Sequence, residues 1–281
     1  MPDETLQDFR DLLARDEPPG LLEGALLIAE TFQPRVDRTS CLAALEQLAQ
    51  GLAPRLAAAR SRMATGAGAA ESARALAAYL HDEAGFSGNA VDYYDARNSF
   101  IDQVLLRRKG IPITLALVYL EAGRRCGLPL HGVGFPGHFL VRLEAQPPVL
   151  LDPFGGSVLD EPCLQGLLQH ALGPAARLEP GHVQPTGTRE IIFRMLTNLK
   201  HIFLRQNELP EALACSHRLL VLAPGAVPEY RDRGLIQRRL GLAAEALADL
   251  QHYLAHAPRD IHVETLERAV RELEGELRRF N

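Results

Sequence analysis

Apolar residues recur at helical spacing through the first part of the chain, so this part is predicted to be mostly helical. Residues 22–32 form an apolar run of helical length, and residues 40–52 carry leucines at helical spacing after Ser40, a suitable N-cap. Residues 55–83 are rich in alanine and arginine and are interrupted by TGAG at 65–68. This segment predicts two helices joined by a turn.

The middle of the chain combines one helix with short runs of β character. The helix is predicted to begin at Pro112, because proline is favoured at the first helical position, and to end at Gly127 before Pro129. The β-like runs that follow are LHGVGF, HFLVRL and PVLLDP, with Pro-Gly and Pro-Pro turns between them. They predict a small antiparallel meander. The expected fold class is therefore α+β, a mainly helical core with a small sheet.

From about residue 188 only helices are predicted, and they carry an internal repeat. The pair Ala-Pro at residues 223–224 recurs at 257–258, and the pair Ala-Leu at 212–213 recurs at 246–247, both at an offset of 34 residues. That period, with small residues in the helices and proline after the second helix, is typical of tetratricopeptide (TPR) repeats. An all-α, TPR-like region is therefore predicted to follow the α+β core.

Two positions bear on this repeat. Gly234 lies where the repeat requires a small residue, whereas Lys200, the equivalent residue of the first unit, does not fit. A pair of generic helical hairpins therefore stays open as the alternative. Residues 260–280 are predicted to form an amphipathic helix that caps the array. The predicted domains are residues 1–187 and residues 188–281.

Composition and charge narrow the possible functions. Hydrophobic residues make up 47% of the 281 residues, enough for a well-filled core. The net charge of -5 argues against a nucleic-acid partner. No run approaches the ~18 apolar residues of a transmembrane helix, so no membrane partner is expected, and the acidic N-terminus lacks a signal-peptide pattern. The four cysteines are scattered, which favours reduced thiols in a cytoplasmic protein.

Candidate chemistry concentrates between Arg107 and Gly156, where a helix start, His138 and Asp152 follow one another. This is the order of a papain-like or transglutaminase-like core. In such a core the helix N-terminus stabilises a cysteine thiolate, a histidine takes the thiol proton, and a carboxylate fixes the histidine tautomer. Here Pro112 occupies the cysteine position. A histidine–carboxylate pair without its sulfur lacks the usual means of acyl transfer.

Two side chains are candidates to replace the missing sulfur. Cys126 lies near the far end of the same helix, about 21 Å from Pro112 at the helical rise per residue, which is too far. Thr114 lies in the first helical turn and carries a hydroxyl. A helix-start hydrogen bond is the favoured interpretation of Thr114, and a nucleophile is the alternative.

The two remaining members of the triad also have structural alternatives. His138 follows Gly137 and opens a predicted strand, where a partly buried histidine with a satisfied hydrogen bond fits the pattern equally well. Asp152 precedes Pro153 and can open a turn. Because the two predicted strands are adjacent, we expect Asp152 to contact the His138 ring.

Residues just upstream are candidates for ligand binding. Tyr93 and Tyr94 either wall a pocket or cover the core with their hydroxyls outward, and Asn98 lies close by in the sequence. The basic triplet at 107–109 is either solvated surface or a partner for a nearby aspartate. Through Arg108 it can also bind an anionic group at the helix entrance.

A metal site is a weaker alternative. His131, His138 and Asp152 supply three ligands of suitable type, but the turn between the histidines leaves their relative facing undetermined. We therefore predict no metal ion and no cofactor.

The long run from Tyr93 to Leu143, followed by LLDPFGG, closely resembles the SirB family of bacterial proteins. The resemblance extends to LEGALLIAE near the N-terminus and implies a transglutaminase-like core followed by TPR helices. In the wider superfamily the helix begins Gly-x-Cys and reaches Gly-x-Pro about seventeen residues on. Here Gly110 and the run Gly127-Leu128-Pro129 match that frame, Pro112 falls on the cysteine, and His138 and Asp152 match the other two triad members.

Two functions follow from these residues. The first is a non-catalytic binding protein with a possible regulatory role, in which a cleft at His138 and Asp152 holds a peptide or small ligand and the TPR helices bind a protein partner. The second is a peptidase, amidase or acyltransferase, in which His138 and Asp152 activate Thr114 or a water. Binding is favoured, because losing a triad nucleophile costs several orders of magnitude in rate.

Overall fold

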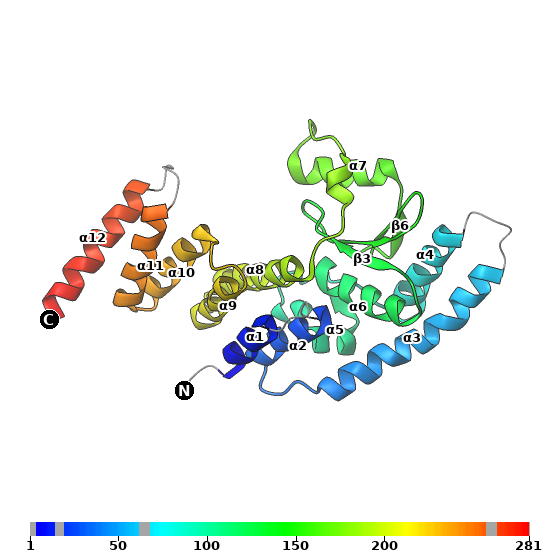
Figure 1. Cartoon of the computed structure of the whole chain (residues 1–281), viewed down its shortest axis with the longest axis horizontal. Coiled ribbons are helices and arrows are strands. Elements are labelled where there is room, and N and C mark those ends of the chain that lie inside the picture. Colours follow the sequence, from blue (N-terminus) through cyan, green and yellow to red (C-terminus); the bar gives the residue numbers. More distant parts are fainter. Residues whose placement is uncertain (1–3, 15–19, 62–67, 257–262, 281) are drawn as a thin grey trace. The chain divides into compact units, whose positions relative to one another are not determined.

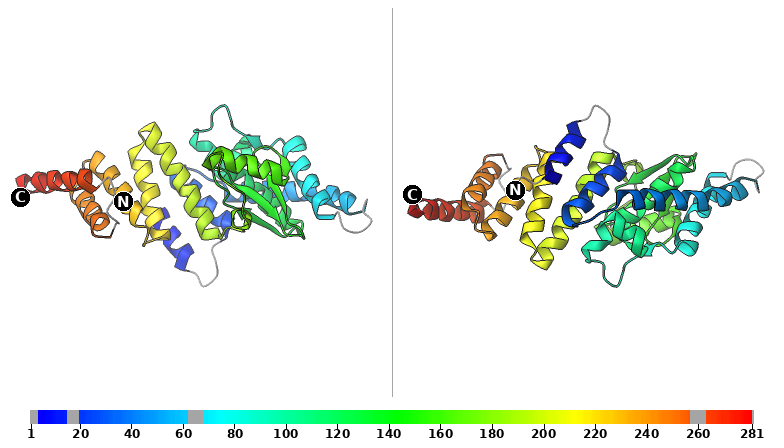
Figure 2. Two further views of the ribbon diagram at one scale, coloured as in Figure 1. Left: turned by 90° about the horizontal axis from the view of Figure 1, so that it is seen from above. Right: turned by 90° about the horizontal axis from the view of Figure 1, so that it is seen from below.

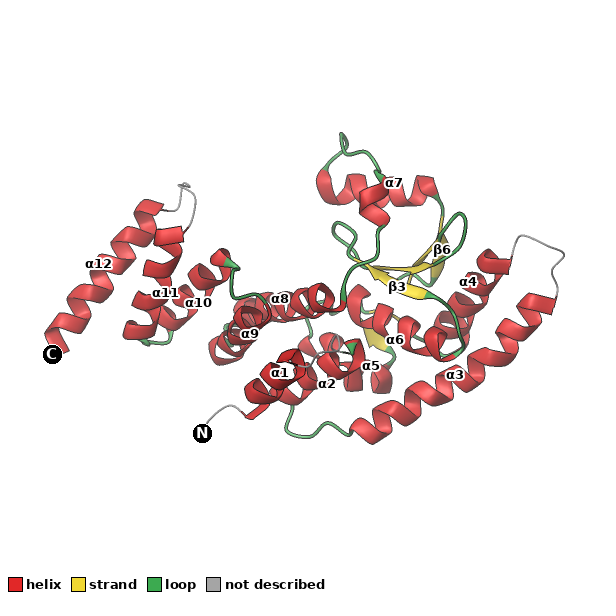
Figure 3. Cartoon of the chain, viewed as in Figure 1, coloured by secondary structure: helices red, strands yellow, loops and turns green. Residues whose placement is uncertain are grey.

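The computed structural model describes residues 4–14, 20–61, 68–256 and 263–280, which are mainly helical with two small sheets (Figure 1, Figure 3). The α-helices are α1 Glu4–Ala14, α2 Leu21–Phe32, α3 Arg38–Ser61, α4 Gly68–Ala78, α5 Ile101–Arg107, α6 Pro112–Arg125, α7 Glu161–Leu172, α8 Thr188–Gln206, α9 Leu209–Leu222, α10 Val227–Arg239, α11 Ala243–His256 and α12 Val263–Phe280. The strands are β1 Ser87–Gly88, β2 Lys109–Gly110, β3 Leu130–Val133, β4 Leu140–Leu143, β5 Val149–Asp152 and β6 Ser157–Leu159. A π-helical turn at Tyr79–Glu83 and 3-10 turns at Ala96–Ser99 and Pro180–Val183 also occur.

The chain divides into two compact units. One is Glu17–Met195, and the other joins Met1–Asp16 to Leu196–Asn281. This division differs from the predicted boundary after residue 187. The boundary falls inside α8, and α1 packs with α9 in the unit that contains the C-terminal helices.

Buried apolar side chains explain both differences. In the first turns of α8, Ile191 and Ile192 are buried, and Ile192 lies so close to Gly24 of α2 that a Cβ there would be 2.5 Å from its Cδ1. In α1, Phe9 and Leu12 are fully buried. Burying a large apolar side chain stabilises the fold by roughly 1.5–3 kcal/mol. The start of α8 and helix α1 are therefore each part of the unit whose residues bury their apolar side chains.

Helix α6 passes through the interior of the unit Glu17–Met195. Its residues from Pro112 to Leu120 are all buried, as expected for a helix that is apolar on every side. It packs against β3, β4 and α3, and the long α3 runs across this unit when seen from below (Figure 2). The start of α6, the predicted nucleophile position, is therefore embedded in the core.

Strands β3 to β6 form the predicted antiparallel meander, in chain order. The three predicted β runs supply β3, β4 and β5, and β6 adds a short fourth strand that the sequence pattern did not indicate. Val133 pairs with Leu140 across the first hairpin. His138 lies in the turn before β4 rather than in the strand, because Gly137 adopts a left-handed φ of 67° and prolongs the turn.

Helix α7 covers one face of this sheet (Figure 1). Its Leu164 and Leu168 are buried in a cluster with Val133, Leu140 and Leu150 from three successive strands. The sheet is thus packed between α7 and α6, which fixes the turn that leads into β4.

The N-terminal helices differ in detail from the prediction. Helix α3 continues through Pro54 instead of breaking near residue 53. Ser40 is not its N-cap, because the helix begins two residues earlier and Asp37 accepts a hydrogen bond from the Ser40 amide at 3.0 Å. The turn predicted at 65–68 falls almost wholly outside the described residues.

The C-terminal helices pack as tightly as the predicted repeat requires. A Cβ at Gly234 of α10 would lie 2.9 Å from Cγ of Leu250 on α11, so only glycine fits there. The predicted capping helix is α12, whose Leu266 and Leu273 pack against α11. The first residues of that prediction, 260–262, lie outside the described residues.

Lys200, the residue that did not fit the repeat, is stabilised in its buried position by ion pairs with two carboxylates. Its side chain is 1% exposed, and Nζ donates hydrogen bonds to Glu229 at 2.7 and 2.8 Å and to Asp232 at 2.8 Å. Both carboxylates come from α10. A lysine can therefore replace a small residue here, because its ammonium is paired and its stem is buried.

Candidate functional site

His138 is held in a tight turn between β3 and β4. Its backbone N–H donates to the Phe135 carbonyl at 3.0 Å, and Gly137 takes the left-handed conformation that the turn requires. A Cβ at Gly137 would lie 2.8 Å from Cβ of Ala171 on α7, so the turn also needs a residue without a side chain. The Pro-Gly pair before His138 thus fixes the turn that positions the His138 side chain.

Arg194 of α8, which is far from this turn in the sequence, also stabilises it. Its guanidinium donates to the Phe135 carbonyl at 3.2 and 3.3 Å and, through Nη2, to the His138 carbonyl. It also lies over the Phe139 ring, 5.4 Å from the centroid. Burial lowers the pKa of Arg194. The sequence analysis missed this residue, since it lies more than fifty positions from the turn and belongs to no motif.

An Arg194→Met substitution is expected to destabilise the fold by about 1–3 kcal/mol, because the His138 carbonyl loses this donor and the Phe135 carbonyl keeps only the bond from the His138 amide. Urea unfolding followed by circular dichroism measures the change. Arg97→Met, at an ion pair whose arginine is 60% exposed, is the matched control and should change stability by less than about 1 kcal/mol. Equal effects of the two substitutions would mean that Arg194 does not hold the turn.

The contact expected between His138 and Asp152 is present. Nε2 of His138 lies 2.8 Å from Oδ1 of Asp152, the last residue of β5. The two side chains are only 13% and 14% exposed. This pair has the geometry by which a carboxylate orients a histidine in acyl-transfer enzymes.

Asp152 is held as a carboxylate. Burial raises its pKa, but the hydrogen bond and charge of His138 and the backbone N–H groups of Phe154 and Gly155 outweigh burial and lower the pKa below its ordinary value. A carboxylate accepts hydrogen bonds only, so Nε2 of His138 carries the proton. Nδ1 is the ring nitrogen that Asp152 does not contact. No hydrogen bond joins Nδ1 to any residue among those that the structure describes.

Thr114 is occupied at the start of α6. Its hydroxyl donates to the Asn98 carbonyl at 2.6 Å and accepts from the Ile111 amide at 3.2 Å, and the side chain is 1% exposed. Pro112 takes the first helical position, as predicted from its missing N–H. The Thr114 hydroxyl thus makes the helix-start hydrogen bonds that the sequence favoured, and none of its hydrogen bonds reaches His138.

The thiols are placed away from this chemistry. Burial raises the pKa of Cys41 to about 11 and also raises that of Cys215. Cys163 is exposed, and a hydrogen bond with Asp160 raises its pKa. Cys126 donates to a backbone carbonyl of α3 at 3.2 Å. No hydrogen bond links any of these thiols to His138 in the described part of the chain.

An aromatic surface leads from His138 to solvent. The Phe154 ring meets the His138 ring edge-on at 6.1 Å between centroids, Tyr93 lies 6.3 Å from Phe154, and Tyr94 lies 5.4 Å from Tyr93. The two tyrosines are 39% and 46% exposed. Gly88 makes room for this arrangement, because a Cβ there would lie 2.4 Å from the Phe154 ring. We name these four rings, including His138, the aromatic surface.

Asn98 and Arg108 make contacts within the scaffold, and their ligand-binding role stays a prediction. Asn98 is fully buried, and its amide donates to the backbone carbonyls of Asp92 and Tyr93 at 2.7 and 3.3 Å. It therefore orders the loop that carries the tyrosines. Arg108 ends α5 with a left-handed φ of 59° and stacks over the Phe86 ring at 4.5 Å.

The predicted arginine–aspartate pair involves Arg107. Its Nη2 donates to Asp95 at 3.0 Å, and Asp95 also accepts from the amide of Arg97. Burial raises the pKa of Asp95, but the hydrogen bonds of Arg97 and the charge of Arg107 lower it below its ordinary value. Arg107 thus anchors the tyrosine loop to α5.

The three-ligand metal alternative has no support in the geometry. His131 lies in β3 opposite Arg142, whereas His138 lies beyond the end of that strand. Within residues 4–14, 20–61, 68–256 and 263–280, no group of three or more histidine, cysteine, aspartate or glutamate side chains is arranged to hold a metal ion.

Comparisons with known proteins place the fold. Residues 39–197 match the transglutaminase-like superfamily, and residues 199–271 match the tetratricopeptide repeat. Protein SirB1 of Salmonella typhimurium is 32% identical over 187 residues, which cover 66% of this chain and 70% of that protein. The chain belongs to the SirB family. A UPF0162 protein of Vibrio cholerae is 40% identical over 196 residues, covering 69% of this chain and 73% of the relative. One of Pseudomonas aeruginosa is 32% identical over 244 residues, 87% of each.

For this SirB-family protein, the matches confirm the predicted fold class and the order of its parts. The TPR match decides between a true repeat and generic hairpins, the alternative that the sequence left open. No described helix combines the length and apolarity needed to cross a membrane. The family and the fold are thereby established. Any inference about the chemistry of the site depends on its geometry.

Proposed function

We propose that this protein is a non-catalytic, transglutaminase-like binding protein. Its aromatic surface binds a peptide or small ligand, its TPR helices bind a protein partner, and its role is regulatory. We place it in the cytoplasm, where its four cysteines, which form no disulfide, stay reduced. The observation that carries the proposal is that Nδ1 of His138 has no hydrogen bond with a thiol or hydroxyl of the described residues. It is supported by Pro112 at the start of α6, where the resemblance predicts the nucleophile.

The energetic argument favours binding over catalysis. In a triad hydrolase the nucleophile and histidine act as one unit, and removing the nucleophile alone lowers the rate by about 10⁶-fold. A helix start occupied by proline leaves no atom there to attack a carbonyl. The aromatic side chains beside His138 retain their value for binding, since exposed tyrosines supply apolar area at low entropic cost.

One observation supports a competing function. The hydrogen-bonded His138–Asp152 pair, with an ionised carboxylate, keeps the arrangement of a general base that can activate water. A pure binding site has less need of this pair. The competing function is a peptidase, amidase or acyltransferase of low activity.

Hydrolysis assays separate the two functions. With fluorescein-labelled casein and p-nitrophenyl acetate as probes, the wild type, His138→Ala and Asp152→Asn proteins are expected to show the same background rate. Thr114→Val should behave like them. A wild-type rate that falls by about 100-fold or more in both His138→Ala and Asp152→Asn would establish catalysis and end the binding proposal.

A further inference from the structure

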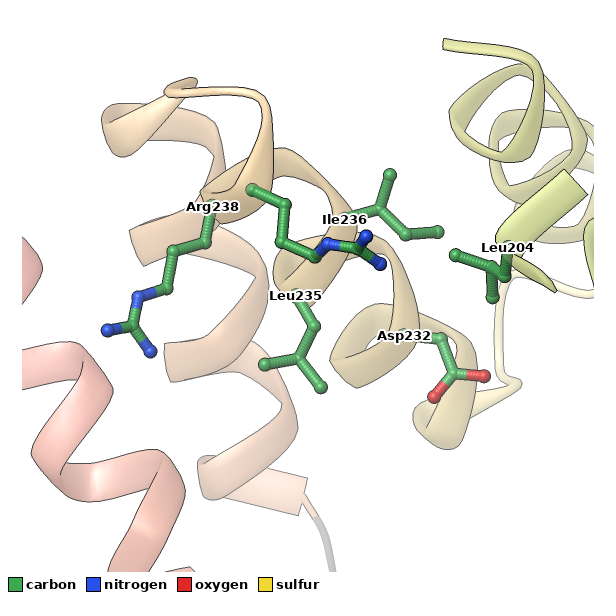
Figure 4. A pocket seen from close by; sticks show the side chains of 6 residues that line it. Leu204, Asp232, Leu235, Ile236 and Arg238 are labelled. Atoms are coloured by element: carbon green, nitrogen blue, oxygen red, sulfur yellow. The ribbon is translucent and has the colours of Figure 1, made fainter. Parts of the chain in front are cut away.

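Two cavities lie side by side among the C-terminal helices. The first, of about 540 Å³, is lined by Leu204, Asp232, Leu235, Ile236, Arg238 and Arg239 (Figure 4). The second, of about 390 Å³, is lined by Arg231, Asp232, Leu235, Thr265 and Leu266. Because Asp232 and Leu235 line both, the cavities form one groove over α8, α10 and α12. We name it the Leu235 groove.

The floor of the Leu235 groove is apolar and partly uncovered. Leu204 of α8 faces Ile236 of α10 in the first cavity (Figure 4), and Leu266 of α12 is part of the second. Leu235 stands between them with 37% of its surface exposed. An exposed leucine with a cavity on each side provides contact for two apolar side chains of a bound segment.

The charges around Asp232, which lines the groove, cancel. The carboxylate of Asp232 accepts from Lys200 at 2.8 Å and from Arg231 at 2.8 Å, and Lys200 also pairs with Glu229. Two cations therefore face two carboxylates. The lowered pKa of Asp232 agrees with this pairing, since the charges of Lys200 and Arg231 outweigh its burial. Asp232 is thus no free acceptor for a basic partner.

At the rim, positive charge remains. Arg239 donates to the neutral side-chain oxygen of Asn207 at 2.6 Å, and no carboxylate of a described residue pairs with it. Arg238 pairs with Glu272 at 2.6 Å, but these side chains are 42% and 51% exposed, so water screens the pair. The uncompensated guanidinium of Arg239 favours a carboxylate, which it can bind through two parallel hydrogen bonds.

We propose that the Leu235 groove binds a segment of a partner protein in which an acidic side chain lies beside two apolar ones. The apolar side chains occupy the cavities on either side of Leu235, and the carboxylate contacts Arg239. Cavities of this size match those that hold ligands of a few side chains. The inference rests on the proposed partner-binding role of the TPR helices and specifies the chemistry of that partner.

A selection from random peptides tests the inference. Displayed peptides of about ten residues, which reach ~30 Å when extended, are selected on the immobilised full-length protein. The enriched peptides are then labelled with fluorescein and titrated by fluorescence anisotropy. We expect an acidic residue close to two apolar residues in the enriched set, and an affinity that weakens with added NaCl.

Three variants locate the binding. Leu235→Glu and Arg239→Glu each place a negative charge against the acidic peptide and should weaken binding by about tenfold or more. Arg271→Glu is the matched control, because Arg271 is 66% exposed on α12 and lines neither cavity; its affinity should stay within about twofold of the wild type. Thermal unfolding by circular dichroism verifies that each variant is folded, and Leu235→Ala serves in place of any variant that is not.

Each contrary outcome overturns the inference in a recognisable way. Enrichment of basic or uncharged peptides would refute the proposed chemistry, and an absence of enrichment would refute a peptide site in the groove. Peptides whose affinity falls in Tyr93→Ala but not in Leu235→Glu would refute the groove and leave a binding function at the aromatic surface. Hydrolysis that depends on His138 would instead refute the non-catalytic proposal and leave the groove untouched.

Discussion

In the Pro112→Cys protein, the new thiol is expected to react with iodoacetamide at about pH 6 at least tenfold faster than Cys163 does. The start of α6 provides unpaired N–H groups whose partial positive charge stabilises a thiolate. The free Nδ1 of His138, oriented by Asp152, is the base that takes the proton. Proline at the first helical position makes no N–H hydrogen bond, so its replacement leaves the helix intact.

Cys163 is a control within the same molecule. It is exposed, as the new cysteine is not, but its hydrogen bond with Asp160 raises its pKa and keeps it a thiol near neutral pH. Mass spectrometry of digested protein gives the alkylation rate at each cysteine separately. The difference between the two rates therefore reports thiolate formation and not access alone.

The double variant Pro112→Cys/His138→Ala decides the cause. If His138 activates the thiol, the double variant should lose most of the rate gain, and Pro112→Cys/Asp152→Asn should lose part of it. A Pro112→Cys thiol that reacts equally fast with and without His138 would show that the helix start does not face the imidazole. The assignment of Pro112 to the nucleophile position would then be wrong.

The contact that the sequence predicted correctly follows from the local order of the residues. A helix start, His138 and Asp152 succeed one another within about fifty residues, and adjacent antiparallel strands necessarily bring their ends together. The His138–Asp152 contact could therefore be inferred from the order of the residues alone. The fourth strand, β6, is short and polar at its start, so it left no alternating pattern to recognise.

The structural roles that the sequence did not reveal depend on distant contacts. Arg194 reaches the His138 turn from α8, and no spacing rule connects the two. Asn98 was a candidate for ligand binding because it lies close to the two tyrosines in the sequence, but that order did not reveal that its side-chain amide donates to two backbone carbonyls of the loop. Burial of a single polar side chain is decided by the whole fold, which a local pattern does not contain.

Lys200 shows the same limit within the repeat. A rule for small residues excluded lysine at this position, because the rule describes the space between helices and not the charges of the neighbouring helix. Here the carboxylates of Glu229 and Asp232 on α10 pair with the lysine ammonium. The fit of the first repeat thus depends on an ion triad, and its removal has a large expected cost.

Lys200→Met is expected to destabilise the protein by about 3–5 kcal/mol, because it leaves the Glu229 carboxylate, 10% exposed, without its partner. Chemical unfolding monitored by circular dichroism measures this change. The double variant Lys200→Met/Glu229→Gln removes the unpaired charge as well and should recover most of the loss. Arg238→Met breaks the exposed pair with Glu272 and should cost less than about 1 kcal/mol.

The pH dependence gives a second test of the triad. Burial raises the pKa of Asp232, but Lys200 and Arg231 lower it below the ordinary value of 3.8 in the folded protein. Its stabilising contribution is therefore present above pH 3.8 and is lost as pH falls through the lower, folded value. Without Lys200 that contribution is smaller, so the stability gap between wild type and Lys200→Met should narrow below about pH 4. A gap that stays constant or widens on acidification would mean that Asp232 gains little from Lys200.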